Sequence, residues 1–134
     1  MQHQPKHKPR RGAAIVELAV TLPVFVLIVL ASVEASSMIF LKQSLEITAY
    51  EGARIAIVPG SNQGNVLAGC GQILSARRVV VDSIVVTPHD FDKKPYGTPI
   101  RVEVTAKCGA NSVISPWFYV SKSISADVTM MKEY

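Results

Sequence analysis

The chain has 134 residues and a formal net charge of +4, a size that suits one small domain together with an apolar segment. All of the excess charge comes from Lys6, Lys8, Arg10 and Arg11, because the residues from Ala13 onward contain ten basic and ten acidic side chains. A neutral body without a basic stripe argues against a nucleic-acid partner.

A long apolar helix is predicted directly after this basic leader, residues 1–12. Residues 18–33 contain no charged side chain, and with residues 13–17 they form a stretch of 21 residues, about 31 Å long as a helix. That length crosses the hydrocarbon core of a bilayer, so the stretch is predicted to be a single transmembrane helix. The basic residues before it place the N-terminus in the cytoplasm and the rest of the chain outside the cytoplasmic (inner) membrane.

One acidic side chain, Glu17, lies near the start of this apolar stretch. A carboxylate inside a bilayer is costly, so its presence indicates a functional reason. Two other interpretations stay open. The stretch is alternatively a secretory signal peptide that is cleaved near residues 33–35, or an uncleaved anchor in which Glu17 has no role.

The helix is predicted to continue beyond the membrane to Val58, because Pro59 and Gly60 then break it. Apolar and small residues recur on one face of this outer half at spacings of three and four. They are Met38, Leu41, Leu45, Ala49, Gly52 and Ala56. This face packs either against the protein's own soluble domain or against a neighbouring subunit. The whole helical element is predicted to span residues 13–58.

Residues 59–134 are predicted to form a small α+β domain outside the membrane. A polar linker at residues 60–65 precedes a short helix through Val66 and Leu74, and a Val-rich strand is predicted at residues 79–86. Apolar and polar residues alternate in two later stretches, 100–107 and 124–131, which predicts two more strands. The expected fold is a long N-terminal helix followed by a short helix and a three-stranded antiparallel sheet.

The two cysteines of the chain, Cys70 and Cys108, follow the transmembrane stretch. On the outer side of the membrane they are expected to form a disulfide, which would close a loop of about 38 residues and stabilise the domain by roughly 3 to 4 kcal/mol. Two buried free thiols are the alternative. Two distant cysteines supply too few ligands for a metal site.

No motif in the sequence indicates catalysis, a cofactor or a metal. His89, Asp90 and Asp92 lie in a turn-rich stretch, where such side chains commonly hydrogen-bond to the local backbone. No serine or cysteine has a convincing base partner, and no glycine-rich phosphate loop is present. The aromatic residues 117–119 are more typical of packing than of a binding platform. The chain is therefore predicted to be a structural or assembly protein and not an enzyme.

Several stretches together resemble the TadE-like proteins, which are pseudopilins or minor pilins of the tight-adherence (Flp) pilus assembly system. They are Arg-Arg-Gly-Ala-Ala-Ile-Val-Glu-Leu-Ala at residues 10–19, Leu22-Pro23, Glu51-Gly52-Ala53-Arg54 and the C-terminal strand at residues 124–133. The most specific feature is Gly12 with a glutamate five residues later.

This resemblance implies a role in pilus assembly and adhesion, with a prepilin peptidase that cuts after Gly12 and leaves Ala13 as the new N-terminus. The Glu17 carboxylate would then pair with the Ala13 amine of an adjacent subunit, which offsets the cost of holding Glu17 in hydrocarbon. The implied partners are the cytoplasmic membrane, the prepilin peptidase, other pilins or pseudopilins, and Tad assembly proteins.

Overall fold

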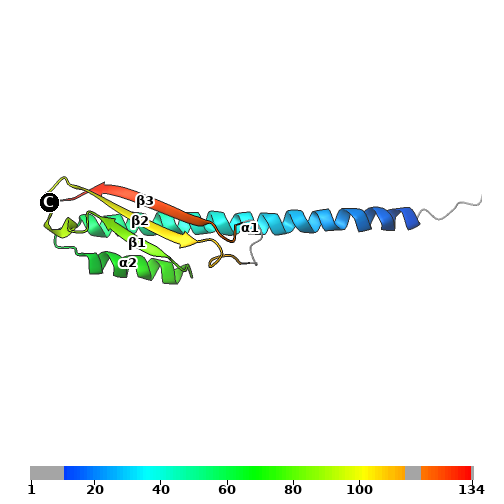
Figure 1. Ribbon diagram of the computed structural model, residues 1–134, viewed down its shortest axis with the longest axis horizontal. Coiled ribbons are helices and arrows are strands. Elements are labelled where there is room, and N and C mark those ends of the chain that lie inside the picture. Colours follow the sequence, from blue (N-terminus) through cyan, green and yellow to red (C-terminus); the bar gives the residue numbers. More distant parts are fainter. Residues whose placement is uncertain (1–10, 114–118, 134) are drawn as a thin grey trace, which may run out of the picture. The chain divides into compact units, whose positions relative to one another are not determined.

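The computed structural model describes residues 11–113 and 119–133 of the chain. Its elements follow one another as α1 (Arg11–Ile57), α2 (Gln63–Ala76), β1 (Ser83–Thr87), the 3-10 turn η1 (Phe91–Lys93), β2 (Pro99–Lys107) and β3 (Ser123–Met131) (Figure 1). The chain divides into two compact units, Met1–Val33 and Glu34–Tyr134. α1 contributes residues to both of them. The predicted α+β class, with a long helix, a short helix and a three-stranded antiparallel sheet, is confirmed.

In the first unit, α1 exposes apolar side chains on its whole surface. Its most apolar window of 18 residues has a mean hydropathy of 2.6, and none of that window is buried. By length and composition, this part of α1 can cross a membrane, as the sequence predicts. Pro23 lies inside the helix, which continues through it.

In the second unit, the three strands form an antiparallel sheet in the order β1-β2-β3. The central strand sets the register, since Val104 of β2 pairs with Ile84 of β1 and with Ala126 of β3. Even-numbered residues of β2 are buried, whereas Arg101 on the opposite face forms an ion pair of 3.2 Å with Asp127. The sheet therefore has one core face and one solvated face.

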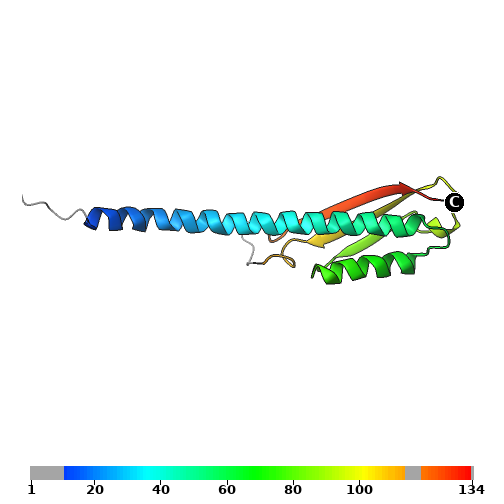
Figure 2. The same cartoon turned by 180° about the vertical axis from the view of Figure 1, so that it is seen from behind.

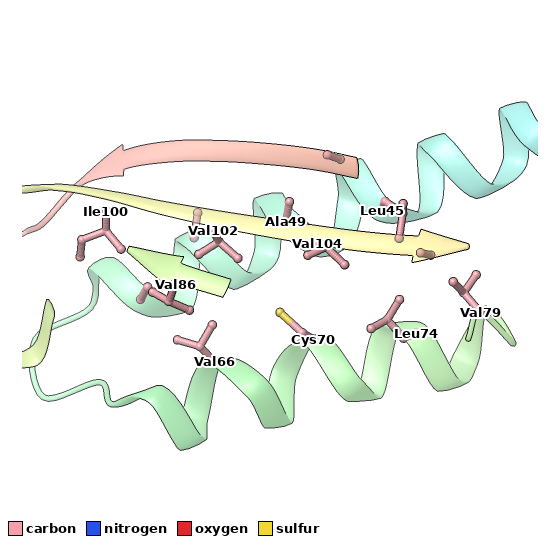
Figure 3. Packing of buried hydrophobic residues seen from close by; sticks show 14 of the residues in the cluster. Leu45, Ala49, Val66, Cys70, Leu74, Val79, Val86, Ile100, Val102 and Val104 are labelled. Carbon is pink, nitrogen blue, oxygen red and sulfur yellow. The ribbon is translucent and has the colours of Figure 1, made fainter. Parts of the chain in front are cut away.

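The core face packs on the second half of α1 and on α2, which run side by side in both views (Figures 1 and 2). The stripe predicted on α1 lies in this core, where Leu41, Leu45, Ala49 and Ala56 are buried. Leu45 and Ala49 lie close to β2 in Figure 3. The sequence allows two packing partners for this face of α1, a neighbouring subunit or the protein's own soluble domain. In the structure the face packs against the protein's own domain.

Two element boundaries differ from the sequence prediction by more than two residues. α2 begins at Gln63, inside the predicted linker 60–65, because the side chain of Asn62 accepts a hydrogen bond of 3.0 Å from the backbone N–H of Asn65 and caps the helix. β1 begins at Ser83 rather than at residue 79, because the backbone of Val80 is hydrogen-bonded to the side chain of Asn111 instead of to a strand.

Candidate functional site

The residues that the sequence predicts for processing lie in the first turn of α1. The helix begins at Arg11, so the peptide bond between Gly12 and Ala13 lies within that turn. Gly12 and Ala13 are exposed, and no heavy atom lies within 4 Å of the position that a Cβ on Gly12 would occupy. Among residues 11–113 and 119–133, no other part of the chain packs against this position.

The side chain of Glu17 is exposed one helical turn after Ala13. Its backbone carbonyl accepts a hydrogen bond of 2.9 Å from the Thr21 hydroxyl. Among residues 11–113 and 119–133, however, no ion pair or hydrogen bond reaches the Glu17 carboxylate. An unpaired carboxylate on an apolar helix is costly in a bilayer, so a cation from elsewhere would stabilise it there.

A second carboxylate on α1 has a role that the sequence does not reveal. Glu34 is the first residue of the second unit, and only 7% of it is exposed. Its Oε1 accepts a hydrogen bond of 3.2 Å from the backbone N–H of Tyr119. This bond joins α1 to the loop between β2 and β3, residues 108–122, hereafter the β2–β3 loop. The two partners are 85 residues apart in the chain, so no local pattern indicates their contact.

The β2–β3 loop has two limbs, one that follows β2 and one that leads into β3. Asn111 holds the limb that follows β2. Its side-chain oxygen accepts a hydrogen bond of 2.7 Å from the backbone N–H of Val80. Its side-chain NH₂ group donates to the Val80 carbonyl at 2.8 Å and to the Lys107 carbonyl at 2.9 Å. The two limbs also touch each other, because a Cβ on Gly109 would lie only 2.8 Å from the backbone oxygen of Val120. The base of the loop is thus fixed at Asn111 and at Glu34.

A shallow groove of about 320 Å³ lies beside this loop, between α1 and β3. It is lined by Ala35, Met38, Ile39, Cys108, Tyr119, Lys122, Ser123 and Ile124. The Nζ of Lys122 lies 5.2 Å from the centre of the Tyr119 ring, within the range of a cation–π contact. The lining is largely apolar, which suits a hydrophobic occupant better than chemistry on a polar substrate.

The disulfide expected between Cys70 and Cys108 is absent, and both residues are free, buried thiols. The Sγ of Cys70 points from α2 toward the sheet (Figure 3) and lies with Val102 around the Cβ position of Gly52. Cys108 directly follows β2 and lies six residues after Val102, about 20 Å in an extended chain. A disulfide requires Cα atoms within about 7 Å, so this packing keeps the two thiols apart.

Burial also determines the chemistry of these thiols. It raises the pKa of both Cys70 and Cys108 above the ordinary thiol value of 9.0. A thiol that stays protonated is a poor nucleophile and a poor metal ligand. Both cysteines therefore act as small core residues, which is the alternative that the sequence left open.

The turn-rich stretch with His89, Asp90 and Asp92 is part of the β1–β2 connection. In the residues that the structure describes, no group of three or more His, Cys, Asp or Glu side chains could hold a metal ion. Asp90 instead pairs with Lys94 at 2.8 Å, and the hydrogen bond from Lys94 lowers the pKa of Asp90. The Nζ of Lys132 donates to three backbone carbonyls of the same connection at 2.8 Å each, those of Phe91, Asp92 and Lys94.

Some residues of the sequence analysis lie outside the described ranges. They are Lys6, Lys8 and Arg10 of the basic leader, and Trp117 and Phe118 of the aromatic stretch.

Comparison with known proteins finds a family similarity in the N-terminal part of the chain. The family model of the TadE-like proteins matches residues 12–54, a segment that contains Gly12, Glu17, Glu34 and Gly52. The resemblance predicted from the sequence is confirmed over this segment. No curated protein and no solved structure matches the chain significantly.

Proposed function

We propose that this chain, whose residues 12–54 are TadE-like, is a non-enzymatic pseudopilin or minor pilin of a tight-adherence (Flp) pilus or secretion apparatus. The first half of α1 anchors it in the cytoplasmic membrane, with the N-terminus in the cytoplasm and residues 34–134 outside. A prepilin peptidase removes the basic leader after Gly12, and the mature chain acts in pilus assembly and adhesion.

The observation that carries this proposal is the carboxylate of Glu17, which has no partner among residues 11–113 and 119–133 and belongs to the fifth residue after the expected cleavage point. Cleavage after Gly12 creates a cationic amine on Ala13 at the same end of α1. When this amine pairs with Glu17 of a neighbouring copy, the two helices lie side by side with an offset of about 6 Å along their axes, since four residues rise by that amount. The pair neutralises both charges within the membrane.

A second observation favours this processing over release by an ordinary signal peptidase. Residues 33–36 belong to α1, which continues without a break to Ile57. Glu34 and Ser37 are buried, and Glu34 is bonded to Tyr119. A cut near residues 33–35 would therefore remove the Glu34 contact from the folded second unit.

The proposal is tested with single variants of the full chain, expressed with a prepilin peptidase and its assembly partners. Gly12→Leu is expected to retain the leader, because a bulky side chain then occupies the open space before the scissile bond. Glu17→Gln is expected to be cleaved normally and to lose incorporation into the assembly by at least tenfold. Glu46→Gln is the matched control, since it makes the same change on an exposed glutamate of α1.

Cleavage and incorporation are measured separately, by intact mass and by co-purification with the assembled partner proteins. Glu17→Gln protein that is incorporated as well as the Glu46→Gln control would contradict the pairing role of Glu17. Normal removal of the leader from Gly12→Leu would contradict the assigned cleavage point.

A further inference from the structure

We infer that the free edge of β3 binds an extended segment of another polypeptide, which adds to the sheet as a fourth strand. The segment would carry apolar side chains on the face that meets the helices and at least one basic side chain on the opposite face. This inference concerns the second unit alone. It goes beyond the proposed function, because it assigns a partner-binding site to a strand outside the TadE-like segment.

The first argument is the direction of the backbone groups along β3. Lys132, directly after β3, donates its backbone N–H to the carbonyl of Thr98, directly before β2, at 3.0 Å. In an antiparallel ladder, alternate residues of a strand bond to the neighbouring strand. Even-numbered residues of β3 therefore bond to β2, and odd-numbered residues point their N–H and C=O groups outward. The last three that point outward are Asp127, Thr129 and Met131.

These outward groups are free over most of the edge. Among residues 11–113 and 119–133, no hydrogen bond reaches the outward N–H and C=O groups of Asp127, Thr129 or Met131. Ser125 differs, because its carbonyl accepts a hydrogen bond of 2.8 Å from the Nζ of Lys42 on α1. β3 is an outer strand of the sheet in both views (Figures 1 and 2). Lysine protects one end of the edge, and residues 127–131 stay open.

The other outer strand, β1, does not offer a comparable edge. It has only five residues, whereas β3 has nine. Val86, near the end of β1, is completely buried, and this burial includes its backbone. In the part of the chain that the structure describes, the accessible edge of the sheet is therefore that of β3.

An extended polypeptide is the partner that fits this edge. Asp127, Thr129 and Met131 each present one N–H and one C=O group, and these sets repeat at about 6.8 Å, the length of two strand residues. A neighbouring strand has donors and acceptors at the same repeat, which is how peptides add to the edges of sheets. A helix uses its own backbone groups internally and does not match this pattern.

The side chains along the edge indicate the composition of the added strand. Val128 and Met130 pack against the core but stay half-buried, so apolar side chains on that face of the new strand would complete their burial. On the opposite face, Arg101 lies between Glu103 at 3.7 Å and Asp127 at 3.2 Å. One cation between two carboxylates leaves a net negative charge, which a basic side chain of the partner would complement.

The probe is the peptide Val-Lys-Val-Thr-Val-Lys-Val with blocked ends, which has the same sequence in both directions. It is added to the full chain in zwitterionic micelles, and amide exchange is followed by NMR. Saturating peptide is expected to slow exchange of the Asp127, Thr129 and Met131 amides at least fivefold. The amides of Val128 and Met130 are expected to change little, because they already bond to β2.

Modified peptides separate backbone pairing from adsorption of an apolar peptide. Only alternate amides of an added strand face β3. N-methylation of one alternate set is therefore expected to abolish binding, whereas methylation of the other set should leave binding within about twofold. A peptide with glutamate in place of both lysines is expected to half-saturate at a concentration at least threefold higher, because it meets the negative cluster around Asp127.

A proline variant tests the same edge from the side of the protein. Thr129→Pro removes an outward N–H and leaves the ladder with β2 intact, a position at which edge strands tolerate proline. It is expected to weaken peptide binding at least fivefold. Thr129→Ala is the matched control, since it keeps the N–H and should bind within about twofold. Slow alkylation of the buried Cys70 thiol verifies that each variant is folded.

Four outcomes would overturn the inference. They are no protection of the three outward amides at millimolar peptide, equal loss of binding for the two methylated sets, equal binding by Thr129→Pro and Thr129→Ala, and protection that rises with the concentration of the chain alone. The last outcome would assign the edge to a second copy. All four leave cleavage after Gly12 untouched, so the proposed function stands or falls separately.

Discussion

The Sγ of Cys70 on α2 lies 2.7 Å from the position that a Cβ on Gly52 of α1 would occupy. The Cγ1 of Val102 on β2 lies 3.1 Å from the same position. Gly52 is thus a point of close approach between α1, α2 and the sheet, and its missing side chain makes room for the Cys70 thiol. This relationship also explains why Cys70 is buried away from Cys108.

Gly52→Ala is expected to lower the free energy of unfolding by about 1 kcal/mol, because overpacking the core exceeds the gain in helix propensity. Gly71→Ala on α2 has open space at its Cβ position and is expected to raise stability by up to about 1 kcal/mol. Both changes in the free energy of unfolding are measured by urea unfolding of the full chain in micelles, with limited proteolysis as the probe of the unfolded fraction. Equal stabilisation by the two substitutions would contradict the close approach at Gly52.

Arg78→Gly is expected to stabilise the fold by about 1 kcal/mol, since Arg78 has the left-handed φ of 55° that glycine adopts freely. Arg78 is the second residue after α2, in the turn where the Val79 N–H bonds to the Leu74 carbonyl at 2.9 Å. Arg77→Gly is the control, because Arg77 has an ordinary φ of −91° and gains nothing from glycine. The same urea assay compares the two variants. A higher unfolding midpoint for Arg77→Gly than for Arg78→Gly would contradict the left-handed conformation of Arg78.

The two cysteines are expected to be free in protein purified without reductant. After unfolding in denaturant, a maleimide should add to both Cys70 and Cys108, whereas the folded chain should react many times more slowly because both thiols are buried. The number of adducts is read by intact mass. A denatured, unreduced chain that takes up no maleimide contains the disulfide that the structure lacks.

Stability is expected to fall as the pH rises above the ordinary thiol value of 9.0. Burial raises the pKa of Cys70 and Cys108 in the folded chain, so the unfolded chain releases these protons at lower pH. Unfolding is therefore favoured progressively above that value, and the full stabilisation is present below it. Urea midpoints between pH 7 and 10 should decline less in a Cys70→Ala, Cys108→Ala double variant; identical declines would rule out a contribution from the thiols.

Much of the fold follows from local patterns in the sequence. Alternation around Val102 and around Ala126 predicts β2 and β3 closely, because one face of each strand must be apolar. The spacing of Leu41, Leu45 and Ala49 likewise predicts the buried face of α1. These signals are strong because each depends on residues within one element.

The features that the sequence does not predict depend on distant partners. The Val-rich stretch before β1 has no periodicity, and Asn111, 31 residues away, decides that Val80 lies outside the strand. The separation of Cys70 from Cys108 depends on which part of β2 faces Gly52. The contact between Glu34 and Tyr119 requires the complete fold, although a single acidic residue at the end of an apolar stretch is a reason to look for one.

The N-terminal sequence of the mature protein, isolated from cells with an active prepilin peptidase, tests the central proposal most directly. The account predicts a chain that begins Ala13-Ala14-Ile15-Val16-Glu17. A mature chain that still begins at Met1, or one that begins near Ser36, would contradict it.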